Sequence, residues 1–131
     1  MESGKKTAPV SKWMLWTGRI ISALPVLMLL FSGAMKLAKP TFVVEEFARL
    51  GYDESVVVGI GIVEIACAVI YAIPQTSFLG AILVTGYLGG ATATHVRIGD
   101  PFYAPVIGGV LVWGGLFLRD ARLRALIPWR S

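Results

Sequence analysis

Four long runs of apolar residues alternate with short polar stretches along the chain. They cover residues 13–37, 56–73, 77–96 and 101–118, and none contains more than two charged residues. A run of ~20 apolar residues is long enough to cross the hydrocarbon core of a bilayer as an α-helix. Backbone in lipid must satisfy its own hydrogen bonds, and these runs lack the alternation of barrel strands. The pattern therefore predicts four transmembrane helices.

Turn-forming residues separate the later runs. Residues 74–77 read Pro-Gln-Thr-Ser and predict a tight turn, and residues 99–101 read Gly-Asp-Pro. In the second group, Asp100 is the expected N-cap of the last helix, with Pro101 at its first position. Such short connections make successive helices antiparallel neighbours. The predicted fold class is all-α, an integral membrane four-helix bundle.

The connection between the first and second runs has a helical pattern of its own. Its apolar residues recur at helical spacing: Val43, Phe47 and Leu50. Glu45 and Arg49 stand four residues apart, which predicts an ion pair on the opposite face. Pro40 or Thr41 is the expected start and Gly51 the expected end. We predict a short amphipathic helix lying on the membrane surface.

Composition supports the membrane assignment and excludes several other classes. The chain has 131 residues, enough for one domain, of which 56% are hydrophobic and only 15% are charged. Its net charge of +4 does not indicate a nucleic-acid-binding protein, because the basic residues flank the apolar runs and form no single stripe. Cys67 is the only cysteine and His95 the only histidine, so neither an intrachain disulfide nor a histidine-rich metal site is expected.

The distribution of lysine and arginine predicts the orientation. Seven basic residues flank the start of the first run and the end of the fourth run: Lys5, Lys6, Lys12, Arg119, Arg122, Arg124 and Arg130. The opposite side has four basic residues, Lys36, Lys39, Arg49 and Arg97, and five acidic residues offset their charge. Because cytoplasmic flanks are enriched in lysine and arginine, both termini are expected in the cytoplasm. The expected organisation is a tail at 1–12, a membrane domain at 13–120 and a basic tail at 121–131.

Glu64 is the most informative single residue, because it stands near the middle of the second run. A carboxylate at that depth costs about 2.5–3.5 kcal/mol on insertion scales, so it should face the interior and either pair with a cation or stay protonated. Tyr71 lies two turns further along the same helical face and is a candidate ligand contact. The alternative is a purely structural role, in which Glu64 hydrogen-bonds two helices together.

Four more candidates lie near the outer ends of the first and third runs. His95 is a candidate acid or base because the ordinary pKa of histidine is near neutrality, although a lone histidine is more often a hydrogen-bonded structural residue. Thr92 shares its helical face. Lys36 and Arg97 close their runs and could equally be anchors whose charges reach the membrane surface.

Depth relates these residues to one another. Glu64 lies roughly 13 Å below the outer end of its helix, at about 1.5 Å per residue. Lys36 and His95 stand near the outer ends of theirs. We therefore predict that the three residues line one cavity that opens outward. In the third run, Gly86 and Gly90 have a small-xxx-small spacing, which predicts close packing against another helix.

Three segments resemble the DoxX-like family of small bacterial membrane proteins. They are Ser-Gly-Ala-Met-Lys-Leu at 32–37, Gly-Ile-Val-Glu-Ile at 61–65 and Ala-Thr-His-Val-Arg-Ile-Gly-Asp-Pro at 93–101. The resemblance covers about residues 13–120. It implies a four-helix fold in the bacterial inner membrane, and it places Lys36, Glu64 and His95 on recurring polar positions of the family.

The resemblance also suggests functions. Some relatives are linked to thiosulfate:quinone oxidation and others to oxidative or quinone stress, while many have no known role. A direct thiol–disulfide relay is not expected, because the chain lacks the cysteine pair that such a relay needs.

Two functional hypotheses follow. In the first, the protein binds or acts on a small lipophilic molecule, quinone-like or isoprenoid-like, without an intrinsic cofactor; whether it is an enzyme stays open. Glu64 and His95 would be catalytic, and the ligand would be held by Lys36, Tyr71, Thr92 and Arg97. In the second, it is a non-catalytic subunit or assembly factor for a membrane redox protein. A homo-oligomer is compatible with both, and a transporter is disfavoured because the chain lacks paired inverted halves.

Overall fold

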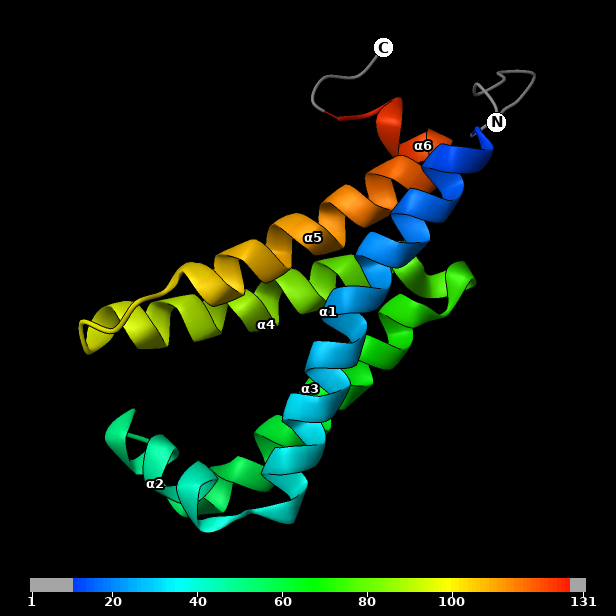
Figure 1. The fold of residues 1–131 in the computed structure, drawn as a ribbon. Coiled ribbons are helices and arrows are strands. Elements are labelled where there is room, and N and C mark those ends of the chain that lie inside the picture. The colour runs from blue at the N-terminus through cyan, green and yellow to red at the C-terminus, as the bar shows by residue number, and fades with distance from the viewer. Residues whose placement is uncertain (1–10, 128–131) are drawn as a thin grey trace.

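The computed structural model describes residues 11–127, which are almost entirely helical (Figure 1). The four long helices are α1 (Lys12–Ala38), α3 (Val57–Ala72), α4 (Ser77–Arg97) and α5 (Tyr103–Arg119). The short ones are α2 (Thr41–Arg49), η1 (Glu54–Val56), η2 (Pro74–Thr76) and α6 (Ala121–Arg124). No strand occurs between residues 11 and 127, so the all-α prediction is confirmed.

Three helical segments are long and apolar enough to cross a membrane. These are Lys12–Ala38, Glu54–Ala72 and Pro74–Arg97, while α5 is apolar but shorter at 17 residues. Large apolar side chains cover the outside of the molecule; Leu27 is 63% exposed and Phe31 69%. Such a surface is unfavourable in water but suits contact with acyl chains. The protein is therefore a membrane protein whose helices contact the bilayer.

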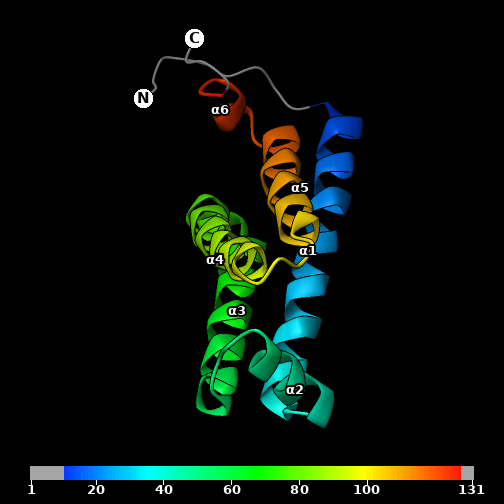
Figure 2. The same cartoon turned by 90° about the vertical axis from the view of Figure 1, so that its left-hand side faces the viewer.

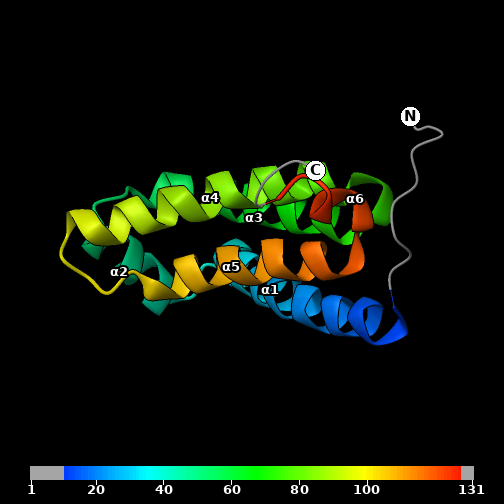
Figure 3. The ribbon, with the colours of Figure 1, turned by 90° about the horizontal axis from the view of Figure 1, so that it is seen from above.

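The four long helices contact one another in a closed order. α1 packs against α3 and α5, and α4 packs against the same two helices. The α1–α3 pair and the α4–α5 pair diverge at one end, as Figures 1 and 2 show. Seen from above, α4 lies over α3 and α5 over α1 (Figure 3). The start of α1 and the end of α5 lie at the same end of the molecule, opposite α2 (Figure 1).

Glycine permits the closest helix crossings. A Cβ atom on Gly115 in α5 would lie 2.2 Å from Ser22 Oγ and 2.9 Å from the Ser22 backbone nitrogen in α1. A Cβ atom on Gly80 in α4 would lie 2.3 Å from the Tyr71 backbone in α3. Real Cβ atoms do not approach other atoms this closely, so both crossings require the absence of a side chain.

Gly115→Ala is expected to lower the free energy of unfolding by about 2 kcal/mol, because overpacking forces the α1–α5 crossing apart. Gly114→Ala is the matched control, since nothing lies within 4 Å of a Cβ there. It should be neutral or stabilise by up to about 1 kcal/mol through helix propensity. Denaturation in a mild detergent measures both, and equal effects would contradict the described crossing.

The amphipathic helix forms where its pattern predicts. α2 begins at Thr41 after Pro40, and Gly51 follows its end with a positive φ of 91°. Its predicted ion pair is wrong, however: Arg49 pairs with Glu46 and not with Glu45, and it also binds Asp100. These contacts draw Arg49 toward the end of α4.

The predicted cap of the last helix is also wrong. α5 begins at Tyr103 with Phe102 at its N-cap and no side-chain cap hydrogen bond. Asp100 binds Arg49 instead, so its carboxylate is not available to cap α5. Part of the predicted C-terminal tail forms α6, in which Leu123 is buried. Lys5, Lys6 and Arg130, which contribute to the predicted orientation, lie outside the described residues.

Candidate functional site

Glu64 and Lys36 form a buried ion pair between α3 and α1. Glu64 is only 2% exposed, and its Oε1 accepts a hydrogen bond from Lys36 Nζ at 2.9 Å. Lys36 Nζ also donates to Ser32 Oγ at 2.7 Å. A Cβ on Gly61 would lie 2.8 Å from Lys36 Cβ, so glycine in α3 brings the two helices together here. The prediction that Glu64 faces inward and pairs with a cation is confirmed.

A cavity of about 560 Å³ lies beside this pair, between the α1–α3 and α4–α5 arms, with α2 on one side. Most of its wall is apolar and comes from five helices. Its polar lining consists of Ser32, Lys36, Glu46, Glu64, Tyr52, Tyr87, Thr94 and His95. Lys36, Glu64 and His95 thus share one cavity, as their depths in the sequence predict.

His95 is held in α4 by a hydrogen bond one turn back. Its Nδ1 lies 2.8 Å from the carbonyl oxygen of Ala91. A carbonyl oxygen only accepts hydrogen bonds, so Nδ1 bears a proton and Nε2 is the acceptor of the neutral ring. Within residues 11–127, no hydrogen bond joins His95 to Lys36 or Glu64. His95 is therefore a separate polar group in the lining, able to accept a proton.

Sequence reasoning missed Tyr87 as a polar member of this site. Tyr87 lines the cavity from α4, as Glu64 does from α3. A signal was present, since a tyrosine in the middle of an apolar helix needs a polar partner for its hydroxyl. Together, Lys36, Glu64 and Tyr87 bring three helices to one polar point.

Gly86 and Gly90 make room for the cavity. Both line it from α4, one turn apart, and nothing lies within 4 Å of a Cβ built on either. The prediction that this spacing packs closely against another helix is therefore wrong. These two glycines leave part of the cavity open that larger side chains would fill.

Three predicted ligand contacts do not line the cavity. The Tyr71 hydroxyl lies 2.6 Å from the Val112 carbonyl oxygen, toward the opposite end of the molecule. Thr92 Oγ1 donates to the Leu88 carbonyl oxygen at 2.8 Å, which satisfies it within its own helix. Their side chains, like that of Arg97, are absent from the lining.

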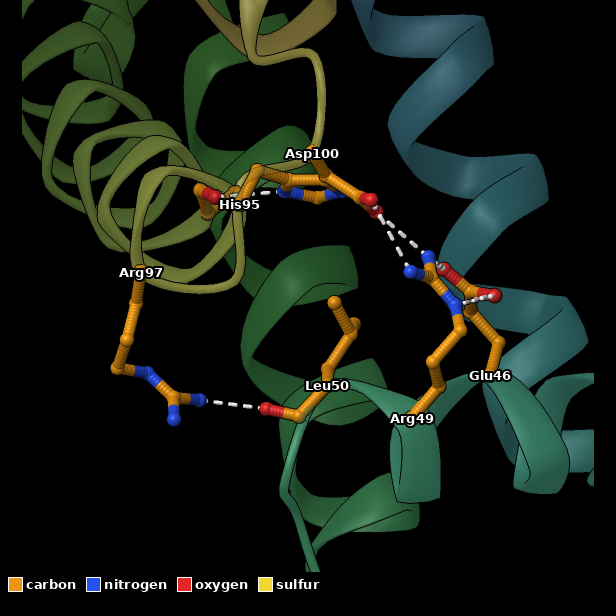
Figure 4. A network of polar contacts seen from close by, with 7 residues as sticks. Glu46, Arg49, Leu50, His95, Arg97 and Asp100 are labelled. Atoms are coloured by element: carbon orange, nitrogen blue, oxygen red, sulfur yellow. Dashed lines mark hydrogen bonds and ion pairs between the residues drawn. The ribbon is translucent and has the colours of Figure 1, made fainter.

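Polar bonds fasten α2 and the residues that follow it to the end of α4 (Figure 4). Arg49 donates to Asp100 at 3.1 Å, and Arg97 donates to the carbonyl oxygen of Leu50. Tyr52 and Thr94 share a hydrogen bond of 2.8 Å between their hydroxyl oxygens. Because Leu50 and Tyr52 line the cavity, these bonds hold α2 and residues 50–52 as a cover over the end of the cavity near α2.

This cover is expected to weaken in acid. The hydrogen bond from Arg49 holds the pKa of Asp100 below its ordinary value of 3.8. A carboxylate whose folded pKa is depressed stabilises the fold above its unfolded pKa and loses that contribution as the pH falls through the folded pKa. Asp100→Asn should therefore be slightly less stable than the natural chain at pH 7 and equal to it below the folded pKa. Thermal unfolding from pH 7 to pH 2 measures this, and a constant gap would argue against it.

Among residues 11–127, no three metal-ligating side chains cluster. In the comparison with known families, a family model described as the DoxX-like family matches residues 20–115. Neither the curated proteins nor the solved structures include a match to the chain. The matched region contains the Lys36–Glu64 pair, Tyr87, His95 and the whole lining of the cavity.

Proposed function

The chain belongs to the DoxX-like family, and from that premise we propose that it binds a small lipophilic molecule within a bacterial inner membrane. In this proposal α1, α3, α4 and α5 all cross the bilayer as a four-helix bundle, and both termini lie in the cytoplasm. α5 has 17 residues, the lower end of the range that spans a membrane. The amphipathic α2 then lies at the outer surface, above the cavity.

The cavity is the observation that carries the proposal. Its volume of about 560 Å³ lies within the roughly 300–1,000 Å³ typical of ligand pockets. Apolar side chains form most of the wall, while Lys36, Tyr87 and His95 supply a few polar groups. This combination suits a molecule with an apolar body and one or two oxygen atoms, such as a quinone-like or isoprenoid-like compound.

The polar groups suggest how such a ligand would be held. Lys36 can donate to a ligand carbonyl oxygen while Glu64 balances its charge. His95 can accept a hydrogen bond or a proton through Nε2. If a bound quinol is oxidised in place, its two electrons would pass to a membrane redox partner. The Glu64 carboxylate and His95 Nε2 would then accept the two protons that the quinol releases.

Mass spectrometry of the lipophiles that co-purify with the protein in a mild detergent tests this proposal. We expect one quinone-like or isoprenoid-like species to be enriched over its share of the whole-membrane extract, in a ratio approaching one per chain. A lipophile profile identical to that of the bulk membrane, together with no binding of an added short-chain ubiquinone or isoprenoid alcohol, would contradict the proposal.

The buried ion pair supports a second candidate function. Lys36 and Glu64 satisfy each other across α1 and α3 without any ligand, as expected of a structural element in a non-catalytic subunit or assembly factor. In that case a partner membrane protein should co-purify in a fixed ratio. Glu64→Gln would then reduce partner capture and leave the lipophile profile unchanged.

A further inference from the structure

Arg119, at the opposite end of the molecule from α2, has no acidic partner among residues 11–127. Its Nε donates to Ser22 Oγ at 3.0 Å, and one terminal nitrogen lies 3.5 Å from Ser77 Oγ. The guanidinium also lies over the Tyr71 ring, 5.3 Å from its centroid. None of the ion pairs in the described part of the chain includes Arg119. Its neighbours are thus neutral groups from three other helices.

A second cavity, of about 290 Å³, opens beside this guanidinium. It is lined by Pro74, Ser77, Leu116, Arg119, Asp120, Ala121 and Arg122, and it shares no residue with the first cavity. Ser77, which is 3% exposed, is its most buried polar residue. The cavity therefore joins a guanidinium and a buried hydroxyl at the end of the apolar helices.

The one acidic residue in this lining is already engaged. Asp120 accepts a hydrogen bond from the Arg122 backbone nitrogen at 2.9 Å and forms an ion pair with the Arg122 side chain at 3.3 Å. Two arginines and one aspartate leave the lining with a net positive charge. That excess resides on Arg119, whose side-chain contacts in the described part of the chain are with uncharged groups.

A guanidinium that is partly withdrawn from water is costly without a counter-charge. Its planar fork of donors matches the oxygen atoms of a phosphate group. We propose that the Arg119 guanidinium binds a phosphate group, either on the headgroup of an anionic lipid or as free phosphate. Ser77 Oγ, whose hydrogen is donated to the Tyr71 carbonyl oxygen at 2.7 Å, accepts from Arg119 and positions it. The place of Arg119 at the end of the apolar part of α5 corresponds to the level of lipid headgroups, where basic pockets between helices bind anionic lipids. This site is independent of the function proposed for the first cavity.

Native mass spectrometry of delipidated protein, titrated with phosphatidylglycerol or phosphatidylcholine, tests the lipid source. The natural chain should bind one phosphatidylglycerol in preference to phosphatidylcholine. Arg119→Gln should weaken that binding at least about tenfold, the effect of losing a charge-assisted hydrogen bond. Arg19→Gln is the matched control, because Arg19 lies near the same end but does not line the cavity. It should weaken binding no more than about fivefold, the effect of one surface charge.

A second titration, with inorganic phosphate against chloride at equal ionic strength and without lipid, tests the other source. If phosphate alone raises the melting temperature and Arg119→Gln removes the rise, the ligand is free phosphate. Should Arg119→Gln fail to fold, Ala121→Glu adds a negative charge to the lining and removes no side-chain contact; it should weaken binding to a similar extent. Equal loss in Arg119→Gln and Arg19→Gln, or no loss in Arg119→Gln and Ala121→Glu, would overturn the proposal.

Discussion

Glu64→Gln is expected to lower the free energy of unfolding by about 3 kcal/mol, because it leaves the Lys36 ammonium buried without its counter-charge. The side chains of Lys36 and Glu64 are only 13% and 3% exposed, so water replaces the lost partner poorly. The value lies at the low end of the range for broken buried pairs because Lys36 keeps its hydrogen bond to Ser32 Oγ. Unfolding in mixed micelles of mild detergent and sodium dodecyl sulfate measures the loss.

The double variant Lys36→Met with Glu64→Gln separates charge from packing. It removes both charges, so most of the stability lost in Glu64→Gln should return, since a buried ion pair is often replaceable by neutral groups at little cost. A double variant as unstable as Glu64→Gln would show that Glu64 acts through other contacts. A loss below about 1 kcal/mol in the single variant would mean that the pair is screened like a surface ion pair.

Gly90→Leu is expected to reduce the amount of co-purifying lipophile at least about fivefold, since forcing bulk into an occupied space typically costs about 1–3 kcal/mol. Gly90 lines the first cavity, and nothing lies within 4 Å of its Cβ position. The leucine side chain would therefore enter the cavity without disturbing a helix contact. Quantitative mass spectrometry of extracted lipophiles, normalised to protein, gives the result.

Gly89→Leu is the matched control for this variant. Gly89 is the preceding residue of α4, also has nothing within 4 Å of its Cβ position, and does not line the cavity. Both variants add the same side chain and the same helix propensity, so they should fold with similar stability. Similar lipophile content in the two variants would show that the bound molecules do not occupy the cavity.

The sequence predicts the helices well, because their signals are local. For example, the ends predicted for the first and third runs, 13–37 and 77–96, lie within one residue of the ends of α1 and α4. The cost of a carboxylate in lipid also predicts that Glu64 turns inward, whichever helices surround it. Its pairing with Lys36 requires only that α1 and α3 be neighbours, as consecutive elements usually are.

The rest of the site depends on how each helix is rotated about its axis, and packing determines that rotation. Thr92 and Thr94 are equally plausible from composition, but α4 turns Thr94 toward the cavity and leaves Thr92 bonded within its own helix. Gly86 and Gly90 have the spacing of a close helix contact, but the divergence of α4 from α1 and α3 leaves them facing open space. Asp100 could have capped α5 had Arg49 not been within reach.

Photo-crosslinking with a short-chain ubiquinone carrying an azide, beside an isoprenoid alcohol carrying a diazirine, tests the central claim most directly. If the first cavity is the ligand site, at least one probe will label α4 between residues 86 and 95 or α1 between residues 28 and 36. Excess unlabelled compound will suppress that labelling, and Gly90→Leu will remove it. Labelling that is spread over lipid-facing positions such as Leu27 and Val110, and that excess compound does not suppress, would contradict the account.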